Sequence, residues 1–355
     1  MRTGDELRIA VVGCGAHANV HGRTILAHPR LALAACCDPD EARARSFAAA
    51  HRCTPHLALE DMLAKERLDA VVLNTWPPLH LAQLRACLAA GVRNVLCEKA
   101  LTISGADALE ILALVRASGA LVVEGYMYRH HPAVRRVEEL VFGSDLGPVD
   151  VVHAAFSNHE PEAHDDALQG RDWRYRRECG GGVTHDWLAY CVNAAHHFAR
   201  SLPKRVFASG AVNERYGVVD RIYGQLEFRN GVAGTVESSK HASFTQALQI
   251  GCARAIVRLP VAWAIFGEVG IDELRRKPDW DFVTARTERI PAADAYALQL
   301  DDFVRAATGR GPPLVSIEES VADAITIDAL ERSLAEGQAV EPDYSALTGR
   351  LECAS

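Results

Sequence analysis

The sequence predicts an α/β protein of two domains: an N-terminal doubly wound parallel sheet, then a C-terminal α+β domain with a large, open, mainly antiparallel sheet. Up to residue 125, short apolar runs alternate with helical patterns, which is typical of a parallel sheet. Beyond residue 200 strand patterns dominate, with polar and apolar residues alternating at 221–228 and a hairpin signal at Asn230-Gly231. Because 355 residues exceed the usual size of one domain, we expect two, spanning 1–125 and 126–355.

Hydrophobic periodicity places the individual elements. In the first domain the expected strands are 8–12, 31–37, 69–74, 92–97 and 121–124, and the expected helices are 16–28, 41–50, 59–65, 81–90 and 106–117. In the second domain we expect helices at 132–142 and from about 180 to 200, and strands at 149–157, 204–212, 221–228, 232–238, 245–251 and 255–259. The segment 261–285 shows no clear pattern, and two helices, 294–307 and 317–336, close the chain.

Composition argues against several classes of partner. The formal net charge is −8 and the chain has no run of Lys or Arg, which disfavours nucleic acid and anionic membranes. No segment approaches the roughly 20 apolar residues of a membrane-spanning helix, and the polar stretch Met1–Leu7 does not resemble a secretion signal. The 10 cysteines are scattered without a Cys-x-x-Cys pair, so we expect reduced packing residues in a cytoplasmic protein.

A glycine-rich turn follows the first strand. The pattern Gly13-x-Gly15-x-x-Ala18 permits a tight strand-to-helix turn that brings backbone N–H groups to a pyrophosphate at the helix N-terminus. Ala18, in place of a third glycine, still allows close packing of helix on strand. Such a pattern is weak alone, but it predicts contacts from Gly13, Gly15, Ala16, His17 and Ala18 to a dinucleotide in a Rossmann-type domain.

Polar residues stand at the ends of the neighbouring strands. Asp38 ends the second strand, about twenty residues after the glycines, where a carboxylate binds the ribose hydroxyls of NAD and repels the 2′-phosphate of NADP. The alternative is that Asp38 only begins a turn or caps the next helix, and Arg43 and Arg45 leave NADP possible. Thr75 and Lys99 also fall at carboxyl ends of strands, the edge along which a cofactor lies.

Another polar group follows the glycines at 180–182. Asp186, Tyr190 and Asn193 stand at i, i+4 and i+7, so a regular helix would carry them on one face. The alternative is a solvated helix face. The glycine-rich start of the helix and the presence of Lys99 favour a site.

Together these residues resemble the glucose–fructose oxidoreductase / inositol dehydrogenase / rhizopine-catabolism (Gfo/Idh/MocA) family, over nearly the whole chain. The shared motifs are Gly13-x-Gly15-x-x-Ala18, Asp38, Thr75 with His80, Glu98-Lys99, Gly180–Gly182 with Asp186 and Tyr190, Gln299-Leu-x-x-Phe303, and 313–318. The resemblance implies a nucleotide-binding domain, then an α/β domain whose open sheet mediates homodimers or homotetramers.

The resemblance also implies hydride transfer between NAD(P) and a hydroxyl-bearing carbon of a sugar, cyclitol or aminocyclitol. It assigns catalytic roles to Lys99, Asp186 and Tyr190. It extends the cofactor contacts beyond the glycine turn to Asp38, Thr75, Trp76, Pro77, His80, Glu98 and Lys99. Two alternatives stay open, a redox-neutral enzyme with retained NAD (an epimerase, dehydratase or glycosidase) and a non-catalytic regulator that senses the nucleotide.

The identity of the base is open at this point. Oxidising an alcohol needs a group that accepts the hydroxyl proton while hydride leaves the carbon. A tyrosine hydroxyl has an ordinary pKa of about 10, so Tyr190 would need a neighbouring cation such as Lys99. Alternatively, a partly desolvated Lys99 carries the proton and Tyr190 is its hydrogen-bonding partner. Asp186 would orient the pair or hold a substrate hydroxyl.

Three residues depart from the family pattern. Ala100 replaces the usual proline after Lys99, so we expect a trans peptide bond there. Trp76 stands where a proline is common in the cofactor loop. Leu188 replaces a glycine between Asp186 and Tyr190, which narrows the room expected for substrate.

Further candidates for substrate contact are Tyr128, Arg174, His185 and Asn193, although His185 lies about 100° round the helix from Asp186 and is equally compatible with a structural role. His159 and His164 superficially suggest metal ligands. Their spacing does not place them on one helical face, as the two histidines of a His-Glu-x-x-His motif lie, so we interpret this segment as a solvated loop and expect no metal site.

Overall fold

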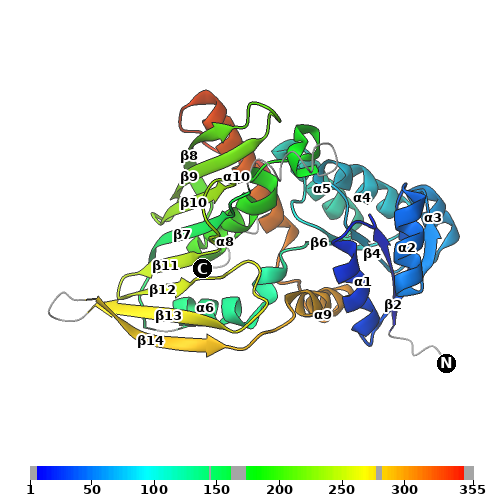
Figure 1. Ribbon diagram of the computed structural model, residues 1–355, viewed down its shortest axis with the longest axis horizontal. Coiled ribbons are helices and arrows are strands. Elements are labelled where there is room, and N and C mark those ends of the chain that lie inside the picture. Colours follow the sequence, from blue (N-terminus) through cyan, green and yellow to red (C-terminus); the bar gives the residue numbers. More distant parts are fainter. Residues whose placement is uncertain (1–5, 144, 161–172, 277–281, 348–355) are drawn as a thin grey trace. The chain divides into compact units, whose positions relative to one another are not determined.

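The computed structural model of the protein describes residues 6–143, 145–160, 173–276 and 282–347 (Figure 1). The chain divides into two compact units, which are considered separately. The first unit takes in the described residues up to Thr102, then Ala106–Met127 and Ala295–Ile317. The second unit takes in Ile103–Gly105, Tyr128–Asp294 and the described residues from Glu318 onward.

The first unit is a six-stranded, fully parallel sheet in the order β3-β2-β1-β4-β5-β6. Its strands are β1 (Leu7–Val12), β2 (Leu31–Cys37), β3 (Thr54–His56), β4 (Ala70–Leu73), β5 (Asn94–Cys97) and β6 (Leu121–Glu124). The doubly wound sheet predicted from the sequence is confirmed. Only β3 was not expected, because it is three residues long, contains Pro55 and lies at the sheet edge, where proline is tolerated.

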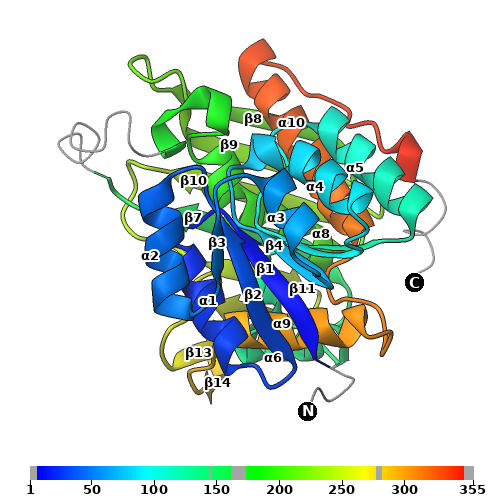
Figure 2. The same ribbon diagram turned by 90° about the vertical axis from the view of Figure 1, so that its right-hand side faces the viewer.

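Helices cover both faces of this sheet. On one face α1 (Ala18–Ala27), α2 (Glu41–His51) and α9 (Ala295–Ala307) pack on β1 and its neighbours in one hydrophobic cluster. On the other face lie α3 (Leu59–Lys65), α4 (His80–Ala89) and α5 (Gly105–Ser118), which Figure 2 shows side by side. The strand order reverses between β2-β1 and β4-β5, which places the ends of β1 and β4 at the switch point.

Helix α9 lies with the first unit, whereas the sequence analysis grouped 294–307 with the second domain. The reason is its apolar face: Leu300, Phe303 and Val304 are at most 2% exposed and join the cluster that contains Ile9 and Ile25. A helix that begins about 170 residues after the end of β6 therefore completes this core. Periodicity predicted the helix itself but not its packing partner.

The second unit is built on an eight-stranded sheet in the order β14-β13-β12-β11-β7-β10-β9-β8. The strands are β7 (Val149–Ser157), β8 (Pro203–Val212), β9 (Val219–Phe228), β10 (Ala233–Ser239), β11 (Leu248–Cys252), β12 (Ala255–Leu259), β13 (Val269–Arg276) and β14 (Phe282–Ile290). Only β7 and β10 pair in parallel, so the predicted mainly antiparallel sheet is confirmed. The segment without a sequence pattern contains β13, whose alternation is broken by Glu273, a buried carboxylate that pairs with Arg275.

Three helices lie on this second sheet (Figure 1). α8 (Ala189–Ala199) packs on β7 and β10, and α6 (Pro132–Gly143) packs on β12 and β13. α10 (Ile317–Glu336) reaches β8 and β9, where the Ser333 hydroxyl accepts the Ala208 N–H at 2.9 Å. Along β9 the inward residues Ile222 and Leu226 are buried, and Tyr223 between them is 45% exposed on the other face.

None of the helices in the described ranges is long and apolar enough to cross a membrane. The nine cysteines among the described residues are all free thiols, and seven of them are buried.

Candidate active site

The turn after β1 is held by the ends of its two neighbouring strands. The N–H of Gly13 donates to the carbonyl of Cys37 at the end of β2 at 2.8 Å, and the Asn74 amide donates to the Gly13 carbonyl at 3.0 Å. Gly13 has φ of +90°, and a Cβ there would lie 2.5 Å from the Asn74 carbonyl oxygen. Only glycine satisfies both constraints.

The same turn leaves a backbone surface open. A Cβ on Gly15 would meet no atom within 4 Å, Ala16 and His17 are exposed, and Ala18 is fully buried where α1 begins. An exposed turn directly before a helix N-terminus suits the negative charge of a pyrophosphate. The residues present therefore fit an adenine dinucleotide.

Asp38 lies at the end of β2, beside this turn. Its Oδ2 accepts the Cys14 N–H at 2.9 Å, and its Oδ1 accepts the Asp40 N–H at 2.9 Å and Arg43 Nη2 at 3.1 Å. The carboxylate is 5% exposed, whereas 54% of the Arg43 side chain is exposed. Asp40, not Asp38, caps α2 by accepting the Arg43 N–H, which removes the capping alternative. The carboxylate expected for ribose recognition thus carries a guanidinium partner.

The loop after β4 continues into a short 3₁₀ turn, Pro77–Leu79, and then α4. Thr75 donates its hydroxyl to Gln83 at 2.6 Å, Trp76 is 38% exposed and Pro77 is buried. His80 is fully buried, and its two ring nitrogens contact the carbonyl oxygens of Leu101 at 3.0 Å and Thr75 at 3.2 Å. His80 therefore joins the loop after β4 to the segment after Lys99 and has no exposed surface.

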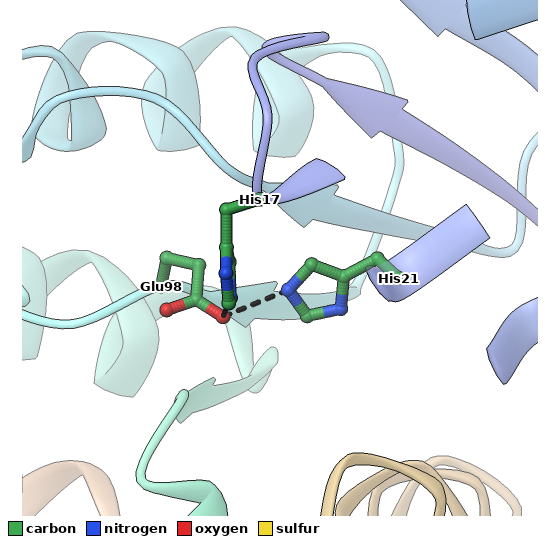
Figure 3. A group of neighbouring side chains, drawn as sticks. All are labelled: His17, His21 and Glu98. Carbon is green, nitrogen blue, oxygen red and sulfur yellow. Dashed lines mark hydrogen bonds and ion pairs between the residues drawn. The ribbon is translucent and has the colours of Figure 1, made fainter. Parts of the chain in front are cut away.

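Glu98 and Lys99 follow β5. The Glu98 Oε1 accepts His21 Nε2 of α1 at 2.7 Å and lies 3.6 Å from His17 Nε2 (Figure 3). Although burial alone would raise the pKa of Glu98, the nearby imidazoles of His17 and His21 hold that pKa well below its usual range. Lys99 is partly exposed. The Lys99–Ala100 peptide bond is cis, so the expectation of a trans bond is wrong. The general preference of bonds before non-proline residues for the trans form does not decide the geometry at Ala100, which is buried in the folded segment.

In the second unit, the predicted helix begins with a turn of π-helix, Thr184–Leu188, before α8. The glycines before it permit very close packing: a Cβ on Gly181 would lie 2.7 Å from three carbonyl oxygens of 173–176. That packing brings Arg174 to Asp186, with Nε 2.6 Å from Oδ2. Asp186 is 5% exposed, and the Arg174 side chain is 39% exposed.

Tyr190, near the start of α8, lies among aromatic rings. Its ring centroid is 5.7 Å from that of Tyr128, 5.6 Å from that of Phe156 and 6.1 Å from that of Trp263. Burial raises the pKa of Tyr128 well above its usual range, and its hydroxyl donates to Asn193 at 2.6 Å. Of the two neighbouring phenols, Tyr128 is therefore fixed as a protonated donor to the protein.

The remaining substrate candidates face the interior of the second unit. Asn193 is fully buried, and its amide donates to Asp323 at 2.7 Å and Glu319 at 3.0 Å. His185 is 6% exposed, with Nε2 3.6 Å from Glu331. Leu188 is also fully buried. The predicted helix begins with a π-helical turn that contains Asp186, and Asn193 joins a buried network with Asp323 and Glu319. That Asp186, Tyr190 and Asn193 share one face turned toward a site stays a prediction.

Within the first unit, the structure brings the Gly13–Ala18 turn, Asp38 and the β4 loop together, and Glu98 meets His17. Three contributors were missed from the sequence. His21 stands four residues after His17, a helical spacing that signals a shared face. Arg43 was noted only as a source of doubt, and Trp263 lies in the segment without pattern. His164 lies outside the described residues.

Comparisons with known proteins agree with this architecture. A family model described as an oxidoreductase family with an NAD-binding Rossmann fold matches residues 7–126, and the C-terminal domain model of the same GFO/IDH/MocA family matches residues 134–269. The D-xylose 1-dehydrogenase (NADP(+)) 2 of Haloferax volcanii is 33% identical over 87% of this chain and 92% of that protein. The dTDP-3,4-didehydro-2,6-dideoxy-alpha-D-glucose 3-reductase of Saccharopolyspora spinosa is 27% identical over 85% of each chain.

Solved structures share the fold. The 3-ketoreductase KijD10 from Actinomadura kijaniata, in complex with NADP and TDP-benzene, superposes with a TM-score of 0.81 at 23% identity, over 93% of this chain and 98% of that one. The aldose-aldose oxidoreductase from Caulobacter crescentus gives a TM-score of 0.82 at 21% identity, over 95% and 99%. The protein is an NAD(P)-dependent oxidoreductase of the dehydrogenase class that acts on CH–OH groups. It belongs to the Gfo/Idh/MocA family, as the sequence motifs implied.

The buried His80 makes stability depend on pH. Burial lowers the pKa of His80 below its ordinary value of 6.5, so the unfolded chain binds a proton more readily than the folded chain does. We therefore expect its contribution to stability to be complete above the unfolded pKa and to be lost as pH falls below it, at up to about 1.4 kcal/mol per pH unit. Urea denaturation at pH 8 and pH 5.5 checks this: His80→Gln should be less pH-dependent than the wild type. Equal pH dependence of the two proteins would contradict it.

Proposed function

We propose that the protein transfers hydride between NAD(P) and a hydroxyl-bearing carbon of a sugar, cyclitol or aminocyclitol. One observation carries the proposal: the chain combines the open glycine turn and Lys99 in one unit with the Asp186–Arg174 pair and Tyr190 in the other. The names of two relatives, a D-xylose dehydrogenase and a dTDP-sugar reductase, support a sugar-like substrate. The free thiols support a cytoplasmic location, which cell fractionation would test.

The first unit supplies cofactor binding. We assign the Gly13–Ala18 turn to the pyrophosphate, Asp38 to a ribose, and Thr75, Trp76, Pro77 and Glu98 to the walls of the cofactor site. His80 holds two of these segments together through backbone carbonyl oxygens. The bound nicotinamide supplies the hydride acceptor or donor. The protein residues must then bind the substrate and manage the proton on its hydroxyl.

We assign that proton to Lys99 and Tyr190. Tyr128 donates its hydroxyl to Asn193, and the neighbouring Tyr190 stands at the position of the family motif, so we assign the contact with substrate to Tyr190. Asp186, neutralised by Arg174, would accept a hydrogen bond from a second substrate hydroxyl. A neighbouring diol is the group that such a pair recognises, which favours a polyhydroxylated substrate over a simple alcohol.

Removing Lys99 should abolish most turnover. A positioned acid or base contributes about 10²- to 10⁴-fold, so we expect Lys99→Ala to lower kcat by that range and Tyr190→Phe by at least tenfold. The measurement follows reduced cofactor with a panel of sugars, cyclitols and aminosugars. Lys65→Ala, in an exposed ion pair on α3, is the matched control.

A kcat of Lys99→Ala within threefold of the wild-type value would contradict the assignment of the proton to Lys99. Product formation without net cofactor reduction would replace the proposal by redox-neutral chemistry. If the two variants together lose no more than Lys99→Ala alone, the residues act as one unit, as proposed.

For the cofactor, we propose that Asp38 favours NAD and that Arg43 keeps NADP usable. Asp38 is held by the Cys14 N–H beside the turn, where a ribose diol would accept or donate hydrogen bonds. Arg43 offsets the charge of that carboxylate and has an exposed guanidinium available for a 2′-phosphate. The two side chains thus act in opposite directions on cofactor choice.

Arg43→Ala should lower kcat/KM for NADP at least tenfold and change that for NAD less than threefold, because only NADP carries the phosphate. Asp38→Ser should do the reverse. Arg45→Ala is the control, since Arg45 pairs with Glu41 at 2.6 Å on the exposed side of α2. Equal losses for both cofactors in Arg43→Ala would show that Arg43 only supports the fold.

We also propose a homodimer or homotetramer through the outer face of the second sheet. Phe207 is 38% exposed, Tyr223 45% and Val212 50%, and all three lie on the paired strands β8 and β9. Apolar side chains on an open sheet face favour burial against a second copy.

Light scattering should give two or four times 38.5 kDa, and Phe207→Asp with Tyr223→Asp should give the monomer. Phe244→Asp, 60% exposed but outside the strands, is the control; a monomeric wild type would refute the proposal.

A further inference from the structure

Three side chains with metal-binding atoms converge in the first unit (Figure 3). His17 directly precedes α1, His21 lies one helical turn later, and Glu98 follows β5. The two imidazole nitrogens and the carboxylate oxygen all lie within 4.8 Å of one another. We propose that His17, His21 and Glu98 bind a divalent transition-metal ion of the zinc class. This departs from the sequence analysis, which expected no metal site.

The separations suit a metal with small adjustments. His21 Nε2 is 2.7 Å and His17 Nε2 is 3.6 Å from the same oxygen, Glu98 Oε1. Ligand atoms at about 2.0–2.1 Å from a tetrahedral zinc ion stand about 3.4 Å apart. The two histidines are four residues apart at the start of a helix, so both rings reach the same side. Shifts of roughly 1 Å would complete three ligands of such a site.

Two of the three proposed ligands are buried, and the third is exposed to solvent. His21 is 1% exposed and the Glu98 side chain 10% exposed, whereas the His17 side chain is 42% exposed. The fixed pair would hold the ion, and His17 would close on it from the solvent side, which also provides the entry path. Water would occupy the fourth position.

Charge also favours an ion here. Glu98 is a buried carboxylate whose Oε1 faces both imidazole nitrogens. A dication bound between the three groups would balance the carboxylate charge, a strong interaction in a medium of low dielectric constant. Two nitrogens and one carboxylate select zinc-like ions over Mg²⁺ and Ca²⁺, which prefer oxygen ligands.

The contacts around the three proposed ligands determine how tightly we expect the ion to bind. Glu98 Oε2 accepts the Lys99 N–H at 3.3 Å, which orients the carboxylate and leaves Oε1 for the ion. The rings of His17 and His21 meet Tyr296 of α9 edge-on, at 5.3 Å and 6.0 Å between centroids. Among the described residues, His21 Nδ1 has no hydrogen-bond partner, so the outer contact that usually orients a metal-bound imidazole is missing. Binding should therefore be weaker than at a structural zinc site.

The test uses the full-length chain after removal of metal by a chelator, with no dinucleotide or substrate present. Titration with Co²⁺, followed by its visible absorption, should reach one ion per chain, and Zn²⁺ should displace it. His17→Ala, His21→Ala and Glu98→Gln should each weaken binding at least tenfold. His241→Ala, a histidine of the second unit paired with Asp220, should bind as the wild type does. Mg²⁺ should not compete.

Several results would overturn the proposal: no saturable binding by the wild type, unchanged affinity in the three variants, or a thiolate-to-cobalt charge-transfer band, which would place the ion on cysteines. Glu98→Gln keeps the size of the side chain and an acceptor for His21, and His17→Ala alters an exposed turn. Unchanged melting temperatures in these two variants would separate lost metal binding from lost folding. Since neither cofactor nor substrate takes part, failure here and failure of the proposed hydride transfer are independent results.

Discussion

The close approach of Gly13 to the end of β4 is the constraint on which the first unit depends. With Asn74 O only 2.5 Å from where a Cβ would lie, the backbones of the two strand ends meet directly. The hydrogen bond from Gly13 to Cys37 ties in the third strand. The ends of three neighbouring strands therefore meet around the turn, at the point where the strand order reverses. Asp38 and Thr75 reach the turn because these backbone contacts fix where their strands stop.

The second unit relies on buried side chains instead. Arg129, 2% exposed, pairs with Glu319 of α10, and its Nη2 lies 2.8 Å from His197 of α8. Asn193 bonds to Tyr128, Glu319 and Asp323 within the same network. Buried polar groups cost free energy unless each is paired, so this network holds α8 and α10 in one register. Tyr190, one turn before Asn193 on α8, takes its position from that register.

The sequence was sufficient where the backbone itself carries the pattern. Glycine spacing and apolar runs predicted all but one strand of the first sheet, the turn at Gly13–Ala18 and α10 at 317–336. It was insufficient where a distant side chain decides the outcome. α9 packs through Phe303 on a core that includes Ile9, almost 300 residues earlier in the chain. In β13 the buried Glu273 interrupts the apolar pattern, and its charge is paired with that of Arg275. Likewise the partner of Asp186, Arg174, lies on a separate turn that no helical periodicity connects to it.

Asp186 and Tyr190 have different surroundings although they are only four residues apart in the chain. Asp186 lies in the π-helical turn Thr184–Leu188 and pairs with the Arg174 guanidinium, whereas Tyr190 lies in α8 among aromatic rings. Arg174 comes from a separate short turn, Trp173–Tyr175, whose carbonyl oxygens approach Gly181 closely enough that a Cβ there would clash. π-helical turns inside helices are rare and concentrate at functional sites. The different surroundings therefore come from the segments that pack against each side chain, and under the proposed function they suit a carboxylate that holds one substrate hydroxyl and a phenol that passes the proton of another.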